Sequence, residues 1–491
     1  MINATVGKDE EMDETPILWS DAVGHLPPHV RDDDIDDAWH AAVNFLPGKI
    51  IVLDDDPTGV QTVHAIPVYT KWDDESLMAV LREDTKVVYV LTNSRALTEA
   101  DTAVLHREIA AGLREAARKT GETVSVVSRS DSTLRGHYPR ETAVLRETLH
   151  RDGDFDGEII VPFFSDGGRL TIDDVHYVRD GEYLLPAGQT EFARDAVFGY
   201  RASNLTEWIA EKTNGAYPSE AVQSISIDML RSLDIDAVEK ILMGLHHFGK
   251  VIVNAADDND LKVFVVALAR VLGAGKRFLF RTAASFVRVF GGIERRPLLG
   301  PVDLYVSGGL EGAGIVVVGS YVEKTTRQVE HLRTLPGMEY VEWDVAHSVD
   351  DAENRRYAAK IQKTVEGIIS SDRDVCLATS REYWKGHDTS LSHEARLRFG
   401  RRISNGLVSV IKNLAHAPRY IVGKGGITSS DIGVHGLAVR RAMVLGQIQP
   451  GVPVWRLGGE SRFPGMPYVV FPGNVGGDDT LTRVVTTLRF P

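Results

Sequence analysis

Apolar and polar positions alternate along the chain in a way typical of α/β proteins. From residue 49 onward, short β-branched runs are separated by stretches of helical periodicity, such as Leu105, Ile109 and Leu113 at four-residue spacing, which predict a helix over 103–119. Such alternation indicates α/β units with largely parallel strands. Buried strands are predicted at 50–53, 87–91, 124–127, 159–163, 251–254 and 278–280.

The pattern stops between residues 291 and 314, where glycine, proline and arginine occur with little periodicity. This interval predicts a linker between domains. A second series of strands is then predicted at 315–318, 341–344, 375–378, 420–422 and 468–471. Because no internal repeat is visible, we expect two distinct α/β domains with largely parallel sheets, over residues 47–290 and 315–491.

Residues 1–46 lie outside this pattern. They are acidic and irregular, with helical character only over 38–45. We expect an N-terminal extension that packs on the surface or is partly disordered. The full length of 491 residues exceeds that of an ordinary single domain and predicts several compact units.

Composition narrows the class of partner. The net charge of −14 disfavours nucleic acid or an anionic membrane as the main partner, because both require a basic surface. One cysteine, Cys376, excludes an internal disulfide framework and is expected to be a buried thiol. The chain lacks a secretory signal pattern and an apolar run long enough to cross a bilayer, so we expect a cytoplasmic location.

Polar side chains follow three successive strands of the first domain. Asp54, Asp55 and Asp56 end the first strand, Arg95 follows the second, and the segment 130–137 follows the third. Open α/β sheets bind ligands at the carboxyl ends of their strands. Because arginine can grip a carboxylate with two parallel hydrogen bonds, a small polyhydroxylated acid is the expected ligand.

Further polar groups in this half leave alternatives open. Ser132 and Thr133 can cap a helix or bind substrate. A fourth strand end carries Gly168 and Arg169, a bare backbone beside a cation. The histidines His137 and His176 have no carboxylate partner in the sequence and are expected to be polar neighbours only, and the sequence has no metal-ligand cluster of the His/Cys type.

Three glycine-rich turns mark the second domain. They are 318–320, 424–428 and 473–477, and each follows an apolar strand. Glycine lets backbone N–H groups approach a polyphosphate without steric cost, so the turns together predict a nucleotide site. Lys424 either reaches a phosphate oxygen or is an ordinary exposed lysine.

Several motifs resemble the four-carbon acid sugar kinase family, from about residue 49 to the C-terminus. They are Asp55-Asp56-x-Thr58-Gly59, the run 130–136, Gly168-Arg169, Thr190 with Asp195, Gly425-Gly426-x-Thr428, the run 450–453 and Gly473-Asn474-x-Gly476. The resemblance implies an N-terminal acid-sugar domain and a C-terminal ATP domain. It also implies transfer of the γ-phosphoryl group to the terminal hydroxyl of threonate, erythronate, 3-oxo-tetronate or a branched relative.

The resemblance assigns site residues in both domains. The predicted substrate ligands are Asp55, Arg95, Ser132, Thr133, Arg135, Gly168 and Arg169. The predicted ATP ligands are Ser320, Gly425, Gly426, Ile427, Thr428, Gly473, Asn474 and Gly476. Departures from the family pattern include Pro57, the run 61–64, Arg129 in place of lysine, and Ile427 in place of a glutamate, which changes how Mg²⁺ is held.

A kinase needs a phosphate cradle, Mg²⁺ and a carboxylate near the acceptor hydroxyl. We expect Asp55 or Asp56 to be the base or the hydroxyl-orienting group, and Asp479 to be a weaker ligand of Mg²⁺ or water. The alternative is a phosphatase of the haloacid-dehalogenase type, in which Asp54 would be the nucleophile and Asp56 the acid/base. That alternative leaves the C-terminal glycine turns unexplained.

A homodimer is expected for an enzyme of this size.

Overall fold

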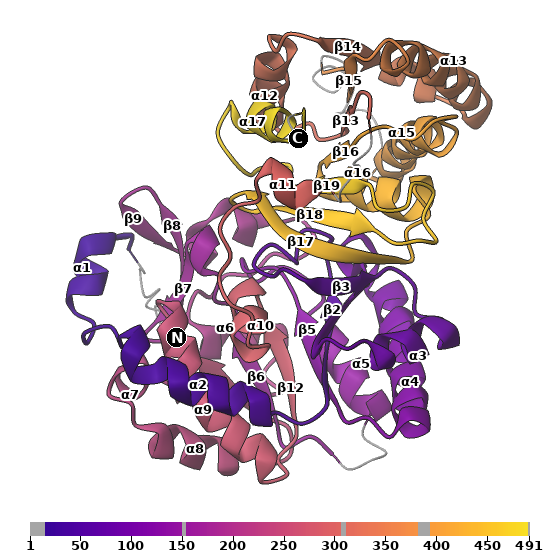
Figure 1. Ribbon diagram of the computed structural model, residues 1–491. Coiled ribbons are helices and arrows are strands. Elements are labelled where there is room, and N and C mark those ends of the chain that lie inside the picture. Colours follow the sequence, from indigo (N-terminus) through magenta and orange to yellow (C-terminus); the bar gives the residue numbers. More distant parts are fainter. Residues whose placement is uncertain (1–14, 150–153, 306–310, 382–392, 490–491) are drawn as a thin grey trace, which may run out of the picture.

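The structure is a computed structural model that describes residues 15–149, 154–305, 311–381 and 393–489. Two α/β lobes share one long sheet (Figure 1). The N-terminal lobe contributes parallel strands in the spatial order β10 (Gln223–Ile225), β11 (Gly249–Val253), β6 (Gly157–Val161), β12 (Phe278–Thr282), β5 (Val124–Arg129), β2 (Lys49–Asp54), β4 (Val87–Leu91) and β3 (Ile66–Tyr69).

The C-terminal lobe continues the same sheet. Its spatial order is β17 (Arg441–Gln449), β18 (Val452–Leu457), β19 (Pro467–Phe471), β16 (Ile421–Lys424), β13 (Ile315–Val318), β15 (Asp374–Thr379) and β14 (Met338–Trp343). From β19 to β14 the strands are parallel, whereas β17 and β18 form an antiparallel hairpin. The lobes are joined where β3 pairs antiparallel with β17, with Tyr69 opposite Arg441 and Ile66 opposite Val444.

Helices cover both faces of the sheet, because its strands are apolar on both sides. In the N-terminal lobe these are α3 (Asp74–Arg82), α4 (Glu99–Thr120), α5 (Arg140–Leu149), α6 (Leu205–Lys212), α7 (Ile227–Arg231), α8 (Ile235–Met243), α9 (Asp258–Gly273) and α10 (Ala284–Phe290). Along β2, Ile51 and Leu53 pack with α3 and α4, whereas Ile50 and Val52 belong to the core that includes α9. This two-residue alternation places α3 and α4 on one face and α9 on the other.

The helices of the C-terminal lobe are α11 (Pro301–Leu304), α12 (Glu323–Arg333), α13 (Asp351–Ile369), α15 (His393–Lys412), α16 (Gly426–Asp431) and α17 (Thr480–Arg489). Val316 and Val318 of β13 pack with α12 and α17, and Ile315 and Val317 face the core that holds α13 and α15. Helix α11 lies within the predicted linker, whose limits stay a prediction.

The region before residue 47 is more ordered than expected. It contains β1 (Ile17–Leu18), α1 (Trp19–Gly24) and α2 (Asp32–Phe45), and α2 lies beside α9 in Figure 1. Trp39 is fully buried and its indole N–H donates to the carbonyl of Val289 at 2.8 Å. The helical character expected over 38–45 lies within α2, but the expectation of irregular chain is wrong for 32–37, where the helix begins. Ile35, Trp39 and Val43 recur at helical spacing and are buried.

The small second sheet completes the N-terminal lobe. Its antiparallel order is β1, β9 (Tyr183–Pro186), β8 (Val175–Asp180) and β7 (Arg169–Ile172).

The predicted fold class, two α/β domains with largely parallel sheets, is confirmed. Cys376 is buried, as expected. Within the described ranges, none of the helices combines the length and apolarity needed to cross a bilayer.

Candidate active site

At the carboxyl ends of β2 and β4, Arg95 binds Asp55 with two hydrogen bonds. The Arg95 Nε donates to Asp55 Oδ2 at 3.1 Å, and its Nη2 donates to Asp55 Oδ1 at 2.8 Å. The third nitrogen, Nη1, lies 3.8 Å from Asp131 Oδ1, beyond hydrogen-bond range. Burial raises the pKa of Asp55 and Arg95 opposes that effect. Arg95 thus orders Asp55 and keeps N–H groups for a ligand.

Asp54 lies deeper than the other two aspartates. It is buried, and Arg129 Nη1 donates to its Oδ1 at 3.2 Å. Burial raises its pKa to about 7. A side chain at Gly59 would clash with the Asp54 carboxylate, so the turn 55–59 covers it closely. A nucleophile must reach its substrate, and this packing disfavours Asp54 in that role.

Asp56 differs from its neighbours in being partly open. One oxygen, Oδ1, accepts hydrogen bonds from the backbone N–H of Thr58 at 2.8 Å and from its hydroxyl at 2.6 Å. Its side chain is 21% exposed and Oδ2 lies 3.7 Å from Arg95 Nη2. Burial raises the pKa of Asp56, but Arg95 and Thr58 outweigh it and the net shift is downward. Asp56 is therefore held ionised with one free oxygen.

The segment after β5 surrounds Asp131. Thr133 Oγ1 donates to Asp131 Oδ2, and Arg135 Nε donates to the same oxygen at 2.6 Å. The Arg135 Nη1 lies 3.8 Å from Asp195 Oδ2, so it too is beyond hydrogen-bond range. Ser132 contributes its carbonyl to the buried His176, whose pKa burial lowers to about 4. His176 therefore supports the segment as a neutral ring.

Arg169 approaches Arg135 from the start of β7. Both guanidinium groups lie near the ring of Phe192, at 5.9 and 5.0 Å from its centre. Gly168 has φ +69°, a left-handed conformation that glycine favours. Burial lowers the pKa of Arg169, and its Nε is buried with no hydrogen-bond partner among the described residues. Two incompletely paired cations therefore share one wall of the site.

Sequence reasoning missed two buried charges beneath this wall. Arg281 of β12 donates from Nη2 to the carbonyl of Arg135 at 3.2 Å, and its Nε and Nη1 have no hydrogen-bond partner in the described chain. Glu141 of α5 accepts a hydrogen bond from Ser94 at 2.9 Å. The signal for Arg281 was a cation inside an apolar strand, between Phe280 and Thr282.

The three glycine turns of the C-terminal lobe meet at the ends of β13, β16 and β19. A methyl group at Gly425 would lie 3.2 Å from Ser320 Cβ, and one at Gly473 would lie 2.9 Å from Ser320 Oγ. A side chain at Gly319 would clash with Thr428. Ser320, Gly425, Thr428 and Gly473 are therefore mutual neighbours, with bare backbone where they converge.

The other predicted nucleotide residues surround this point. Asn474 contributes its carbonyl to Lys324 at 3.2 Å, Gly476 has φ +83°, and Ile427 is a largely exposed apolar side chain. Lys424 is fully buried, which contradicts the alternative of an exposed lysine. Its Nζ donates to the carbonyls of Pro472 at 2.6 Å and Gly473 at 3.2 Å.

Magnesium has no all-protein cage in the described residues, where no group of three His, Cys, Asp or Glu could hold a metal. Asp479 is half exposed and pairs with Arg483 at 3.3 Å. Mg²⁺ in phosphotransfer enzymes is usually bound by one or two carboxylates together with substrate phosphates. Asp56, with its free oxygen, suits that arrangement better than Asp479 does.

The two halves of the site face each other. A methyl group at Gly426 would lie 3.3 Å from Asp56 Oδ2, which is the one described atom within 4 Å outside the neighbouring residues and the backbone of α16. Asp56 Oδ2 therefore lies next to the second glycine turn. A group bound at the turns and one bound near Asp56 would be adjacent.

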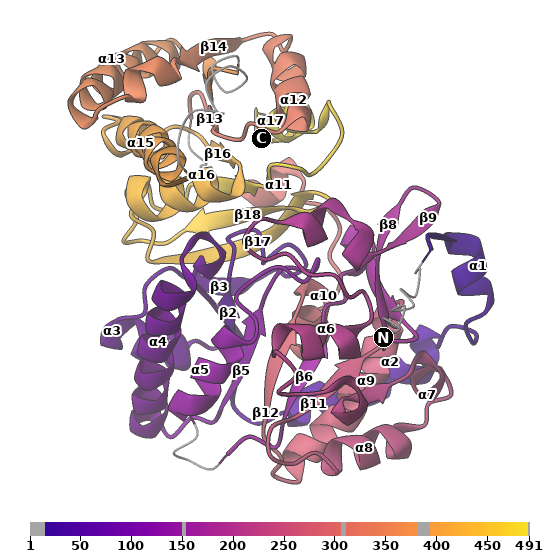
Figure 2. The ribbon, with the colours of Figure 1, turned by 180° about the vertical axis from the view of Figure 1, so that it is seen from behind.

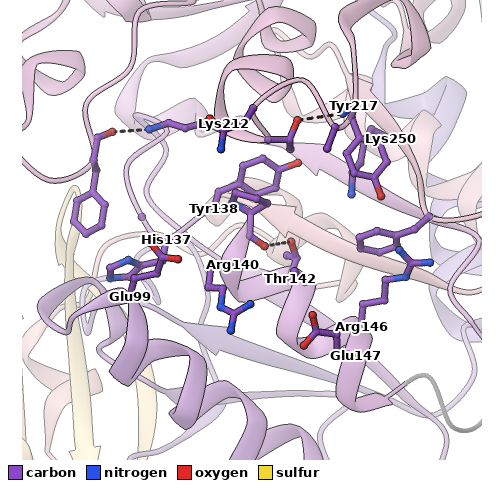
Figure 3. Close-up of a pocket in the computed structure, with 18 of the residues that line it drawn as sticks. Glu99, His137, Tyr138, Arg140, Thr142, Arg146, Glu147, Lys212, Tyr217 and Lys250 are labelled. Atoms are coloured by element: carbon purple, nitrogen blue, oxygen red, sulfur yellow. Dashed lines mark hydrogen bonds between the residues drawn. The ribbon is translucent and has the colours of Figure 1, made fainter.

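A cavity of about 800 Å³ lies elsewhere in the N-terminal lobe (Figure 3). It is bordered by Tyr138, Arg140 and Tyr217, and by basic residues that are paired: Arg146 with Asp154 at 2.6 Å and Lys250 with Glu158 at 2.6 Å. None of the predicted substrate or nucleotide ligands lines it. Its size alone does not make it the active site.

Two domain families match this chain. Residues 50–290 match a sugar-binding N-terminal domain, and residues 315–481 match a nucleotide-binding C-terminal domain. The D-threonate kinase of Salmonella typhimurium is 24% identical over 447 residues, covering 88% of this chain and 96% of that protein.

Two solved structures share the fold. A Haemophilus influenzae protein has a TM-score of 0.61 at 18% identity, covering 89% of this chain and all of the other. A Salmonella typhimurium protein has a TM-score of 0.64 at 16% identity, covering 89% and 98%.

Fold, site and matched domains define a two-domain protein that joins a sugar-binding domain to a nucleotide-binding one. The chain belongs to the four-carbon acid sugar kinase family.

Proposed function

We propose that this protein is an ATP-dependent kinase of a small sugar acid. The acceptor would be the terminal hydroxyl of a tetronate such as threonate, erythronate or 3-oxo-tetronate, or of a branched relative. The observation that carries the proposal is the approach of Asp56 Oδ2 to Gly426, because it brings a carboxylate for the acceptor next to a turn suited to phosphate. The D-threonate kinase relative supports the same substrate class.

Each half supplies a distinct part of the chemistry. Arg95 and Arg135 would bind the substrate carboxylate through their Nη1 groups, with Arg169 adding positive charge. Asp56 would orient the acceptor hydroxyl and accept its proton as the acceptor oxygen bonds to the γ-phosphorus and the bond from that phosphorus to the leaving ADP breaks. Asp55 would act indirectly, by fixing Arg95.

The turns around Ser320, Gly425 and Gly473 would hold the nucleotide by backbone N–H groups. When bound, Mg²⁺ would neutralise charge on the phosphates, with Asp56 as its protein ligand. Asp56 would then serve both the metal and the acceptor hydroxyl. These assignments of ligands are proposals that site-directed variants can test.

The test is a panel of four-carbon and branched sugar acids incubated with Mg-ATP and the purified chain, following ADP release. We expect at least one acid to elicit ADP, and Asp56→Asn to abolish the signal. The same preparation is tested with p-nitrophenyl phosphate. Hydrolysis of that ester, lost in Asp54→Asn, without ADP release from any acid, would refute the kinase and favour the phosphatase.

A further inference from the structure

Three cations surround the glycine turns, and each comes from a different element. Lys424 ends β16, Lys324 lies in the first turn of α12, and Arg381 follows β15. Of the three, the sequence drew attention only to Lys424, as a group that could reach a phosphate oxygen.

Each cation donates to a backbone carbonyl of a turn. Lys424 Nζ donates to Pro472 and Gly473, Lys324 Nζ donates to Asn474 at 3.2 Å, and Arg381 Nη1 donates to Ser320. The carbonyls belong to the first and third turns. The three basic side chains are therefore held around the point where Ser320 and Gly473 meet.

No carboxylate of the described residues lies within ion-pair distance of any of the three, whereas the buried cations Arg231 and Lys250 each have one. Lys324 and Arg381 are partly exposed. Lys424 is fully buried, with its ammonium 3.9 Å from the centre of the Phe471 ring. The Nε and Nη2 of Arg381 are buried, and neither has a hydrogen-bond partner among the residues that the structure describes. Unpaired buried charge is costly. An anionic ligand at the turns would supply the missing partner.

The charged groups that act on Lys424 are all positive. Burial, together with the nearby charges of Lys324 and Arg381, lowers its pKa to about 7. An anion at the turns would reverse this balance and favour the charged lysine.

We propose that Lys324, Arg381 and Lys424 form a receptor for the polyphosphate of the nucleotide, with Lys424 as a positioning residue that also holds the third turn. The proposal rests on the proposed kinase function and extends it. It implies that affinity depends on the number of phosphates and that the base and ribose contribute little to these contacts. It also implies that binding draws a proton from solvent onto Lys424.

Isothermal titration calorimetry of the full chain with Mg-ATP, Mg-ADP and AMP tests the proposal. The variants are Lys424→Met and Lys324→Met, and Lys360→Met on the exposed surface of α13 is the matched control. We expect each of the first two variants to weaken ATP and ADP by at least about tenfold while AMP changes little, since a charge-assisted contact to phosphate is lost. The control should bind like the wild type.

Proton uptake provides an independent readout. Titrations at pH 7.5 in buffers of different ionisation enthalpy should show uptake of up to about three quarters of a proton by the wild type, because a lysine with a pKa of about 7 is mostly neutral there. Lys424→Met should abolish that uptake.

Equal weakening of ATP and AMP, or no weakening, would overturn the receptor and leave the kinase intact. If Lys424→Met does not fold, Lys324→Met decides alone by the same criterion. A wild-type chain that binds no nucleotide would instead overturn the proposed function itself.

Discussion

Gly426 offers a sharp test of the site, because one methyl group can be added without straining the backbone. Its φ is not in the left-handed region, unlike that of Gly425 at +116°. It is the first residue of α16, where alanine is a better helix former than glycine. Gly426→Ala is therefore expected to keep the fold, and its one new contact would be with Asp56 Oδ2 at 3.3 Å.

That contact is a few tenths of an ångström too close, so the carboxylate must move. Misplacing a reacting group by about 1 Å can cost about 100-fold in rate. A smaller displacement, in the space that the phosphoryl group would occupy, predicts a kcat about 5- to 10-fold lower. The free energy of unfolding should stay equal or rise by up to about 1 kcal/mol, because helix propensity improves.

The assay compares kcat from coupled ADP release with thermal unfolding, for Gly426→Ala and for Gly367→Ala. Gly367 lies exposed in α13, and a methyl group there would have no neighbour within 4 Å. Both variants should unfold at or above the wild-type temperature, and only Gly426→Ala should lose activity. Unchanged kcat in Gly426→Ala would refute the idea that Asp56 and this turn enclose the reacting groups.

Three further outcomes follow from the structure. Arg135→Ala should raise the KM for the sugar acid about 10- to 100-fold and leave ATP binding nearly intact, as the loss of a charge-assisted bond predicts, while Arg146→Ala, a paired arginine of similar exposure, should not. Because the pKa of Asp54 is raised in the folded state, the free energy of unfolding should decrease as the pH rises from about 4 to about 7. Urea titrations of Asp54→Asn over the same pH range should show a smaller decrease. Trp39→Ala should cost about 3–5 kcal/mol of unfolding free energy, whereas the exposed Phe45→Ala should be neutral within about 0.5 kcal/mol.

Local pattern predicted the parallel strands because each is a short, apolar, β-branched run. The predicted strands at 87–91 and 315–318 coincide with β4 and β13. The hairpin of β17 and β18 was not predicted, although Pro450 and Gly451 mark its turn. Its register shifts near Gly446 break the two-residue alternation, and its partner β3 is remote in the sequence.

The polar residues at the strand ends predicted where the candidate site lies, but not how its carboxylates and arginines pair. Position along the sheet brought Asp55, Arg95 and the segment 130–137 together. Sequence could not decide between Asp55 and Asp56, because the difference lies in which one Arg95 binds with two hydrogen bonds. Likewise, the burial of Lys424 depends on packing between β16 and β19, which no local pattern reveals.

The pairing of β3 with β17 also bears on how such a chain can be divided or recombined. Cutting the chain at the linker would leave each lobe with an unpaired strand edge, because β3 of the N-terminal lobe hydrogen-bonds to β17 of the C-terminal lobe. Such edges tend to find new partners in other molecules. The two lobes are therefore not interchangeable modules: replacing one with that of a relative would require the backbone ladder to be matched along with the ligands.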